Sequence, residues 1–420
     1  RSLILIFVTA SVATGGLGLS DTVAANMQSN LTAFSYLLPL FGAVIVDKYI
    51  GARYTTPVGM FIAAAGYFTG GIAKSSAGVY AMIFLVSLGL ALFKNGAIIG
   101  RVITDKSQMD PAFSMRYTLV NVGAFIGTFL VGILYKDVFA KDGVLGFAPC
   151  FKMAALMMVL GGLWYIFVCW RFLGDLGKLP FKKTLTEEEK AAEAKKKEET
   201  GTKQPLTTIE KKRIGAIFVA SLFSIVFWIF WYLGYMPVYF YWAENMDWVV
   251  AGYQVPSTWF DAANSLFCVI LGPVTAALWK KLAARPQGDM SLFRKTGLGI
   301  AIIGVGYLFY AAIDIMRGGE KASVLWLIVF AFLLTMGEMF FSPLGHSFIS
   351  KYSPSRYLAV MMSVWGFATF IAAKSYGPVY GLLFGGKIEF KVACIGVAVV
   401  SFAAALIMIA LDKTLSALVD

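Results

Sequence analysis

A single carboxylate, Glu338, follows an uncharged apolar run over residues 324–337, and more apolar sequence comes after it. An isolated ion is costly in hydrocarbon, so acids within membranes pair with a cation, line a water-filled cavity or carry protons. Glu338 is therefore a candidate for ion pairing or proton coupling. The structural alternative is a carboxylate that reaches toward the membrane surface or fixes helix packing.

Other side chains offer little chemistry. Cys150, Cys169, Cys268 and Cys394 lie in apolar segments without CxxC spacing, which predicts core residues and neither a disulfide framework nor a zinc site. His346 is the one histidine and cannot build a metal site alone. There is no Ser/His/Asp set and no phosphate-binding glycine loop before a lysine. The sequence predicts a protein that is not an enzyme and needs no cofactor.

The composition indicates an integral membrane protein. Of 420 residues, 59% are hydrophobic and 15% aromatic, far above an ordinary soluble domain. A bilayer core about 30 Å thick needs roughly 20 apolar residues per helix. Segments of this kind lie near residues 2–19, 31–46, 54–73, 78–100, 112–134, 147–172, 214–241, 258–279, 296–316, 324–349, 357–385 and 390–411. They are too long and too glycine-rich for membrane strands, so we expect an all-α membrane protein with twelve transmembrane helices.

A linker rich in Lys and Glu divides these segments into six and six. We expect an N-terminal six-helix bundle over 1–173, a linker over 174–213 and a C-terminal six-helix bundle over 214–420. The linker, "DKYIGAR", "WKKLAARPQGDMSLFRK" and "SKYSPSR" share one side if the segments alternate, and excess Lys and Arg marks that side as cytoplasmic.

The net charge of +12 is thus mainly an orientation signal and not a nucleic-acid surface. We expect a multi-pass protein of the cell membrane whose linker and C-terminus are cytoplasmic and whose surroundings are lipid. The chain starts at Arg1, within an apolar segment and without an initiator methionine, so we expect further residues upstream.

The stretch "GAVIVDKYIGAR", residues 42–53, joins the second and third segments. It resembles the loop signature of the major facilitator superfamily, whose two six-helix halves rock about a central site. Glycines permit close helix approach, and Asp47 can cap a helix or pair with a base on a neighbouring helix. We assign Asp47 and Arg53 to gating, with an ordinary charged turn as the alternative.

Further stretches resemble the proton-dependent oligopeptide transporter family over nearly the whole chain. "FSYLLPLFGAVIVDKYIG" resembles that family's second helix, "LGLALFKNGAI" its fourth and "AFSMRYTLVNVGAF" its fifth. "QVPSTWFDAANSLFCVILGPVTAALW" resembles the eighth helix, and "TMGEMFFSPLGHSFISKYSPSRYLAVMMSVWG" the tenth and eleventh. The last two are the most specific.

This resemblance implies roles for particular residues. Glu338 matches the tenth-helix glutamate that pairs with a fourth-helix lysine, here Lys94, so that a charge pair spans the two halves. Lys94 is also expected to bind substrate, and Arg1 matches an arginine that meets a substrate carboxylate. The remaining matches to pocket positions are Tyr36, Asn121, Trp228, Asn264 and Trp365.

One departure from the family pattern affects the predicted substrate. The family usually carries an acid or glutamine on its seventh helix, where this chain has Trp231 and Tyr232. We expect a proton-coupled symporter that imports small peptides or related small solutes by alternating access, acting as a monomer. The alternatives are a transporter of another small metabolite, a nitrate-like anion or a drug on the same fold, and a membrane sensor or scaffold that does not transport.

Overall fold

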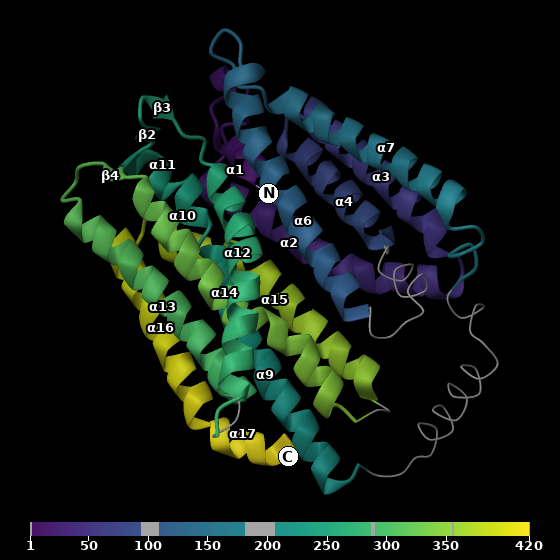
Figure 1. Ribbon diagram of the computed structural model, residues 1–420. Coiled ribbons are helices and arrows are strands. Elements are labelled where there is room, and N and C mark those ends of the chain that lie inside the picture. Colours follow the sequence, from purple (N-terminus) through teal and green to yellow (C-terminus); the bar gives the residue numbers. More distant parts are fainter. Residues whose placement is uncertain (1, 94–108, 181–205, 287–289, 355–356, 420) are drawn as a thin grey trace. The chain divides into compact units, whose positions relative to one another are not determined.

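The computed structural model describes residues 2–93, 109–180, 206–286, 290–354 and 357–419, and these residues are overwhelmingly helical (Figure 1). The chain divides into two compact units. Unit 1 comprises Leu3–Val120 and Ile133–Thr202, and unit 2 comprises Asn121–Gly132 and Lys203–Asp420, together with Ser2.

The helices of the N-terminal part of the chain match six of the twelve predicted segments. They are α1 (Ser2–Thr9), α2 (Asp21–Lys48), α3 (Ala52–Ile72), α4 (Ser76–Leu92), α6 (Met109–Ile133) and α7 (Phe147–Phe172), with a 3₁₀ turn, η1 (Val12–Thr14), and a π-helical turn, η3 (Leu134–Val138).

The helices of the C-terminal part match the other six segments, so twelve of the described helices account for all twelve. These are α9 (Thr208–Leu233), α12 (Trp259–Ala283), α13 (Leu292–Met316), α14 (Leu325–Tyr352), α15 (Leu358–Phe384) and α16 (Phe390–Ala410). Short elements connect or extend them: α10 (Met236–Tyr239), α11 (Tyr241–Asn245), β1 (Met246–Asp247), β2 (Val249–Val250), β3 (Tyr253–Gln254), β4 (Ala322–Ser323) and α17 (Asp412–Val419).

The ends of some predicted segments were wrong. The first helix, expected over 2–19, ends at Thr9, because Ser11 caps the turn η1 and Gly15 and Gly18 adopt positive φ angles of 86° and 63°. Helix α2 begins at Asp21, ahead of the expected 31. The segment expected over 214–241 divides into α9, α10 and α11, with Pro237 in the first turn of α10.

Glycines set the close helix contacts within unit 1. An added Cβ on Gly59 of α3 would lie 2.4 Å from the carbonyl oxygen of Gly89 on α4. The same spacing recurs from Gly89 to the oxygen of Gly59, so no larger residue fits at this crossing. Figure 1 shows α3, α4 and α7 side by side in this unit.

Unit 2 packs α13 against α14 and α16, α12 against α14, and α9 against α15. Buried tyrosines of α13 close the contact with α9, because Tyr307 donates to the carbonyl oxygen of Phe230 at 2.7 Å and Tyr310 to that of Gly234 at 3.2 Å. These bonds satisfy backbone oxygens at the end of α9, where the helix stops.

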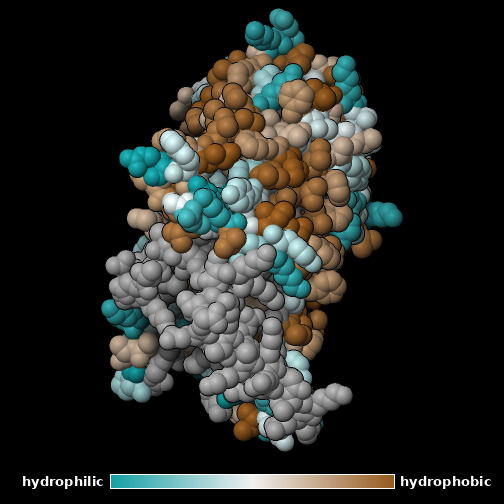
Figure 2. Space-filling view, turned by 90° about the vertical axis from the view of Figure 1, so that its right-hand side faces the viewer, coloured by the Kyte–Doolittle hydropathy of each residue, from teal (hydrophilic) through white to brown (hydrophobic). Residues whose placement is uncertain are grey.

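The outer surface of unit 1 suits hydrocarbon. On α7, Trp164 and Trp170 are 66% and 72% exposed, and Figure 2 shows a broad brown region on the face of the molecule where this helix lies. Among the described residues, seven helices are long and apolar enough to cross a membrane. An apolar exterior over long helices is what a bilayer requires of a helical protein.

Candidate functional site

The carboxylate of Glu338 on α14 lies beside polar side chains of α12. The amide nitrogen Nδ2 of Asn264 donates to Oε2 of Glu338 at 3.3 Å, and the thiol of Cys268 donates to the same oxygen at 3.9 Å. Asn264 and Cys268 are one helical turn apart, so both face the carboxylate. Glu338 is half-buried, and both groups present a hydrogen to its carboxylate oxygen.

A second bond of Asn264 fixes this arrangement to the preceding turn of α14. Its Nδ2 atom also donates to Oγ1 of Thr335 at 2.8 Å. Gly337 between these residues packs against α13, where an added Cβ would come within 2.9 Å of Ile303. Because Gly337 faces α13, the next residue in the helix turns Glu338 toward α12.

An aromatic wall lies one turn beyond Glu338. The ring of Phe341 on α14 stacks on Phe227 at 4.0 Å between centroids, and Trp228 approaches it edge-on at 6.1 Å. Trp365 of α15 lies 6.2 Å from Phe341 at an interplanar angle of 21°. The structure thus brings the predicted residues Trp228 and Trp365 together through Phe341.

Trp231 and Tyr232, at the place of the family's seventh-helix acid, are buried within the same aromatic group. Tyr232 stacks on Tyr376 at 5.1 Å, and Trp231 packs on Tyr235 at 4.9 Å. The indole N–H of Trp231 finds no hydrogen-bond acceptor among the described residues. The indole N–H of Trp231, a hydrogen-bond donor, thus lies at the position where the family pattern has an acid or glutamine, whose side-chain oxygen can accept a hydrogen bond.

The motif over residues 42–53, for which a gating role is predicted, meets the first residues of the linker inside unit 1. A guanidinium nitrogen of Arg53 donates to the carbonyl oxygen of Gly174, and the Arg53 backbone N–H donates to that of Gly177 at 3.1 Å. An added Cβ on Gly51 would lie 2.2 Å from the Gly177 oxygen, so this position requires glycine. Asp47 lies on α2, and its side chain is outside the described residues.

The other predicted residues are distributed as follows. Tyr36 is on α2 and 38% exposed, and Asn121 is half-buried on α6. Arg1 and Lys94 lie outside the described residues, as does the side chain of His346. Of the predicted set, the described contacts join Asn264 to Glu338 and, through Phe341, Trp228 to Trp365.

The sequence assigned no role at the site to three neighbours of these residues: Thr335, Phe341 and Cys268. Helical spacing could have identified them. Thr335 and Phe341 lie three residues before and after Glu338, and Cys268 follows Asn264 by four, so each lies on the same helix face as a predicted site residue. Cys268 was expected to be a core residue, and it is 3% exposed, but its thiol also reaches the carboxylate.

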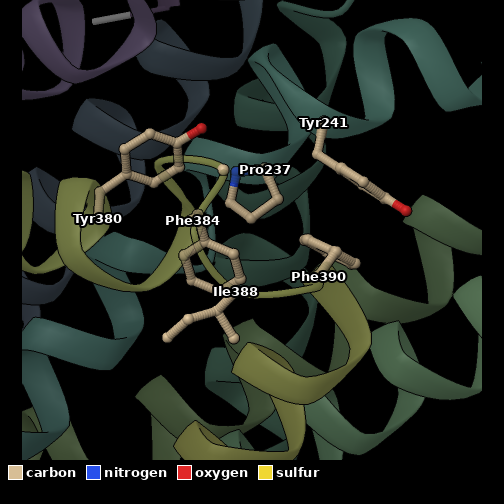
Figure 3. Close-up of a pocket in the computed structure, with 7 residues that line it drawn as sticks. Pro237, Tyr241, Tyr380, Phe384, Ile388 and Phe390 are labelled. Carbon is tan, nitrogen blue, oxygen red and sulfur yellow. The ribbon is translucent and has the colours of Figure 1, made fainter.

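A pocket of unit 2 lies apart from all of these residues. Its volume is about 120 Å³, and its walls come from α10, α11, the end of α15 and the segment that leads into α16 (Figure 3). The labelled side chains around it are Pro237, Tyr241, Tyr380, Phe384, Ile388 and Phe390. None of the predicted site residues that the structure describes lines it.

A family model described as the POT family matches residues 176–384. That span contains α9 and α12 to α15, the helices that carry Trp228, Asn264, Glu338 and Trp365. The chain belongs to the POT family. Glu338, on α14, therefore lies within the part of the chain that matches the POT family model.

Known proteins similar to this POT-family chain come from several bacteria. An uncharacterized transporter, YclF, of Bacillus subtilis (strain 168) is 24% identical over 89% of this chain and 82% of its own. A di-/tripeptide transporter of Lactococcus lactis subsp. cremoris is 24% identical over 86% of this chain and 80% of its own.

Solved structures resemble the whole fold. A peptide transporter POT in complex with alafosfalin matches with a TM-score of 0.87 at 23% identity, covering 100% of this chain and 92% of that one. A POT family transporter in complex with 5-aminolevulinic acid matches with a TM-score of 0.85 at 23% identity, covering 99% and 92%. The predicted all-α membrane fold of the major facilitator type is confirmed.

Proposed function

We propose that this protein is a proton-coupled secondary active symporter that imports small peptides or related small solutes by alternating access. The observation that carries the proposal is the Glu338 carboxylate, held by Asn264 and Cys268 on a membrane helix of a POT-family chain. Such an acid can take up and release a proton within the membrane.

Protonation of this acid would drive the change of conformation. As an ion, Glu338 pairs with Lys94 of the other half and closes the cytoplasmic side of the cavity. A proton on the carboxylate weakens that pair and frees the halves to reorient with substrate bound. Asp47 and Arg53 belong to the cytoplasmic latch, and protons are the coupling ion, without a cofactor.

The proposed substrate site has cations, Lys94 and Arg1, in the N-terminal half and an acid, Glu338, in the C-terminal half. Lys94 and Arg1 attract a substrate carboxylate, Tyr36, Asn121 and Asn264 form hydrogen bonds to it, and Trp228 and Trp365 provide apolar walls. The donor N–H of Trp231 supports this polarity, because it favours an acceptor on the substrate over an ammonium.

Peptide recognition is therefore restricted to substrates whose anionic end dominates. An aromatic face attracts an ammonium by roughly 0.5 to 2 kcal/mol, less than a desolvated ion pair can provide. Relatives named as di-/tripeptide transporters support peptides as the substrate class. A small amino-acid-like metabolite is a second candidate, because a similar structure holds 5-aminolevulinic acid.

The decisive experiment is uptake driven by a pH gradient in liposomes. Dipeptides with a free C-terminus are compared with the same peptides amidated there, in the intact protein and in Lys94→Ala. We expect uptake of the free acids only, and a loss of that uptake in the variant. Equal uptake of amidated peptides, or an unchanged Lys94→Ala, contradicts the proposed site.

The remaining features follow from membrane transport. The protein resides in the cell membrane as a monomer, with its linker and C-terminus in the cytoplasm. The excess of Lys and Arg near the linker supports this orientation, because positively charged loops are retained on the cytoplasmic side.

A further inference from the structure

The hydroxyl of Thr335 is oriented by a bond within its own helix. Its hydrogen is donated to the carbonyl oxygen of Ala331 at 2.7 Å, and the side chain is fully buried. A hydroxyl has a single hydrogen, so toward Asn264 the Thr335 oxygen acts only as an acceptor.

This acceptor determines which way the Asn264 amide points. With Thr335 accepting at 2.8 Å, the NH₂ group of Asn264 must face α14, and its second hydrogen is directed to Oε2 of Glu338 at 3.3 Å. The reversed amide would place its oxygen against the Thr335 oxygen, and the hydroxyl would have to give up its bond to Ala331 to supply a hydrogen between them. Asn264 is therefore held as a donor to the carboxylate.

The other helices packed on this part of α14 bring mainly uncharged groups to it. Helix α13 presents Gly299 and Ile303 to Gly337, while α9 and α15 present Phe227, Trp228 and Trp365 to Phe341. Titratable or charged residues of these packed helices include Asp261 and Cys268 of α12, Tyr232 of α9, and Lys374 and Tyr376 of α15. Among these, Cys268 contacts the carboxylate.

We propose that Thr335 is a positioning residue that sets the pH range in which Glu338 takes up its proton. By holding the Asn264 amide as a donor, it favours the ionised carboxylate. The inference rests on the proposed proton coupling, in which Glu338 is the acid that titrates.

The sign of the effect follows from the amide. Without an acceptor at position 335, the Asn264 side chain can turn over and offer its carbonyl oxygen to a protonated Glu338. The protonated form then gains a hydrogen bond to the amide oxygen, so the carboxyl group accepts its proton at a higher pH.

The test is an infrared pH titration of the full-length protein in lipid nanodiscs. The carboxyl band of Glu338 is identified by its loss in Glu338→Gln. We expect Thr335→Val, which keeps the shape, to raise the midpoint by about one pH unit, the effect of one hydrogen bond to a charged group. Thr335→Ser keeps the hydroxyl and should retain the native midpoint.

Three outcomes would overturn the inference: a native midpoint in Thr335→Val, an equal shift in Thr335→Ser, or no titrating Glu338 band in the native protein. If the valine variant does not fold, Thr335→Ala replaces it and decides by the same midpoint. The titration needs no transport, so a shifted midpoint in a protein without uptake would support the inference and reject the proposed function.

Discussion

Glu338 is the residue on which coupling depends at the scale of single side chains. Its carboxylate accepts from Asn264 and Cys268, so replacing it by glutamine keeps the shape but removes the group that can ionise. We expect Glu338→Gln to reduce pH-gradient-driven uptake to the rate measured without a gradient. Exchange of labelled for unlabelled substrate across the membrane should persist, because exchange needs no net proton movement.

Glu244→Gln is the matched control, since Glu244 is an exposed acid of α11 in the same unit. It should leave both kinds of uptake unchanged. Gradient-driven uptake that survives in Glu338→Gln would assign coupling to another acid.

A polar cluster fastens α11 to α13 at the scale of secondary-structure elements. Arg317 pairs with Asp314 at 2.7 Å and donates to the Tyr241 hydroxyl at 2.8 Å, and Tyr241 also donates to Asp314. Burial alone would lower the pKa of the Arg317 guanidinium, but the bonds to Asp314 and Tyr241 raise it above its ordinary value, so the residue stays charged. The Tyr241 ring stacks on Phe390 of α16 at 3.8 Å.

Because Asp314 is left buried without its cation, we expect Arg317→Met to lower the free energy of unfolding by about 2 kcal/mol. Thermal unfolding in detergent measures the loss. The comparison is Lys391→Met, which removes an exposed pair with Glu389 at 3.1 Å and should cost at most about 0.5 kcal/mol. Equal losses in the two variants would mean that the cluster adds no stability.

At the scale of the whole molecule, orientation in the membrane follows from charge. Basic residues near the linker and at the end of α12, Lys280 and Lys281, lie on one side if the helices alternate. We expect a protease to cut the linker over 174–212 in inside-out vesicles and to leave it intact in right-side-out vesicles. Cleavage from the outer face would mean that the topology is inverted.

The sequence by itself determined the number and type of the membrane segments. Lipid offers no hydrogen bonds to a backbone, so a long apolar run has to become a helix whatever its neighbours are. The resemblance also named Asn264 and Glu338 as site residues, but it paired Glu338 with Lys94, and the contact between Asn264 and Glu338 came from the structure.

Tertiary structure decided the ends of helices and the neighbours of the site. The stop of α1 at Thr9 depends on a capped turn and two glycines, whereas hydrophobicity continues to residue 19. The helices of a membrane protein are apolar on most sides, so periodicity does not reveal which side faces which partner. With Gly337 packed on α13, helix α14 is rotated so that Glu338 faces Cys268 of α12. The same rotation of α14 brings Thr335 within hydrogen-bond distance of Asn264.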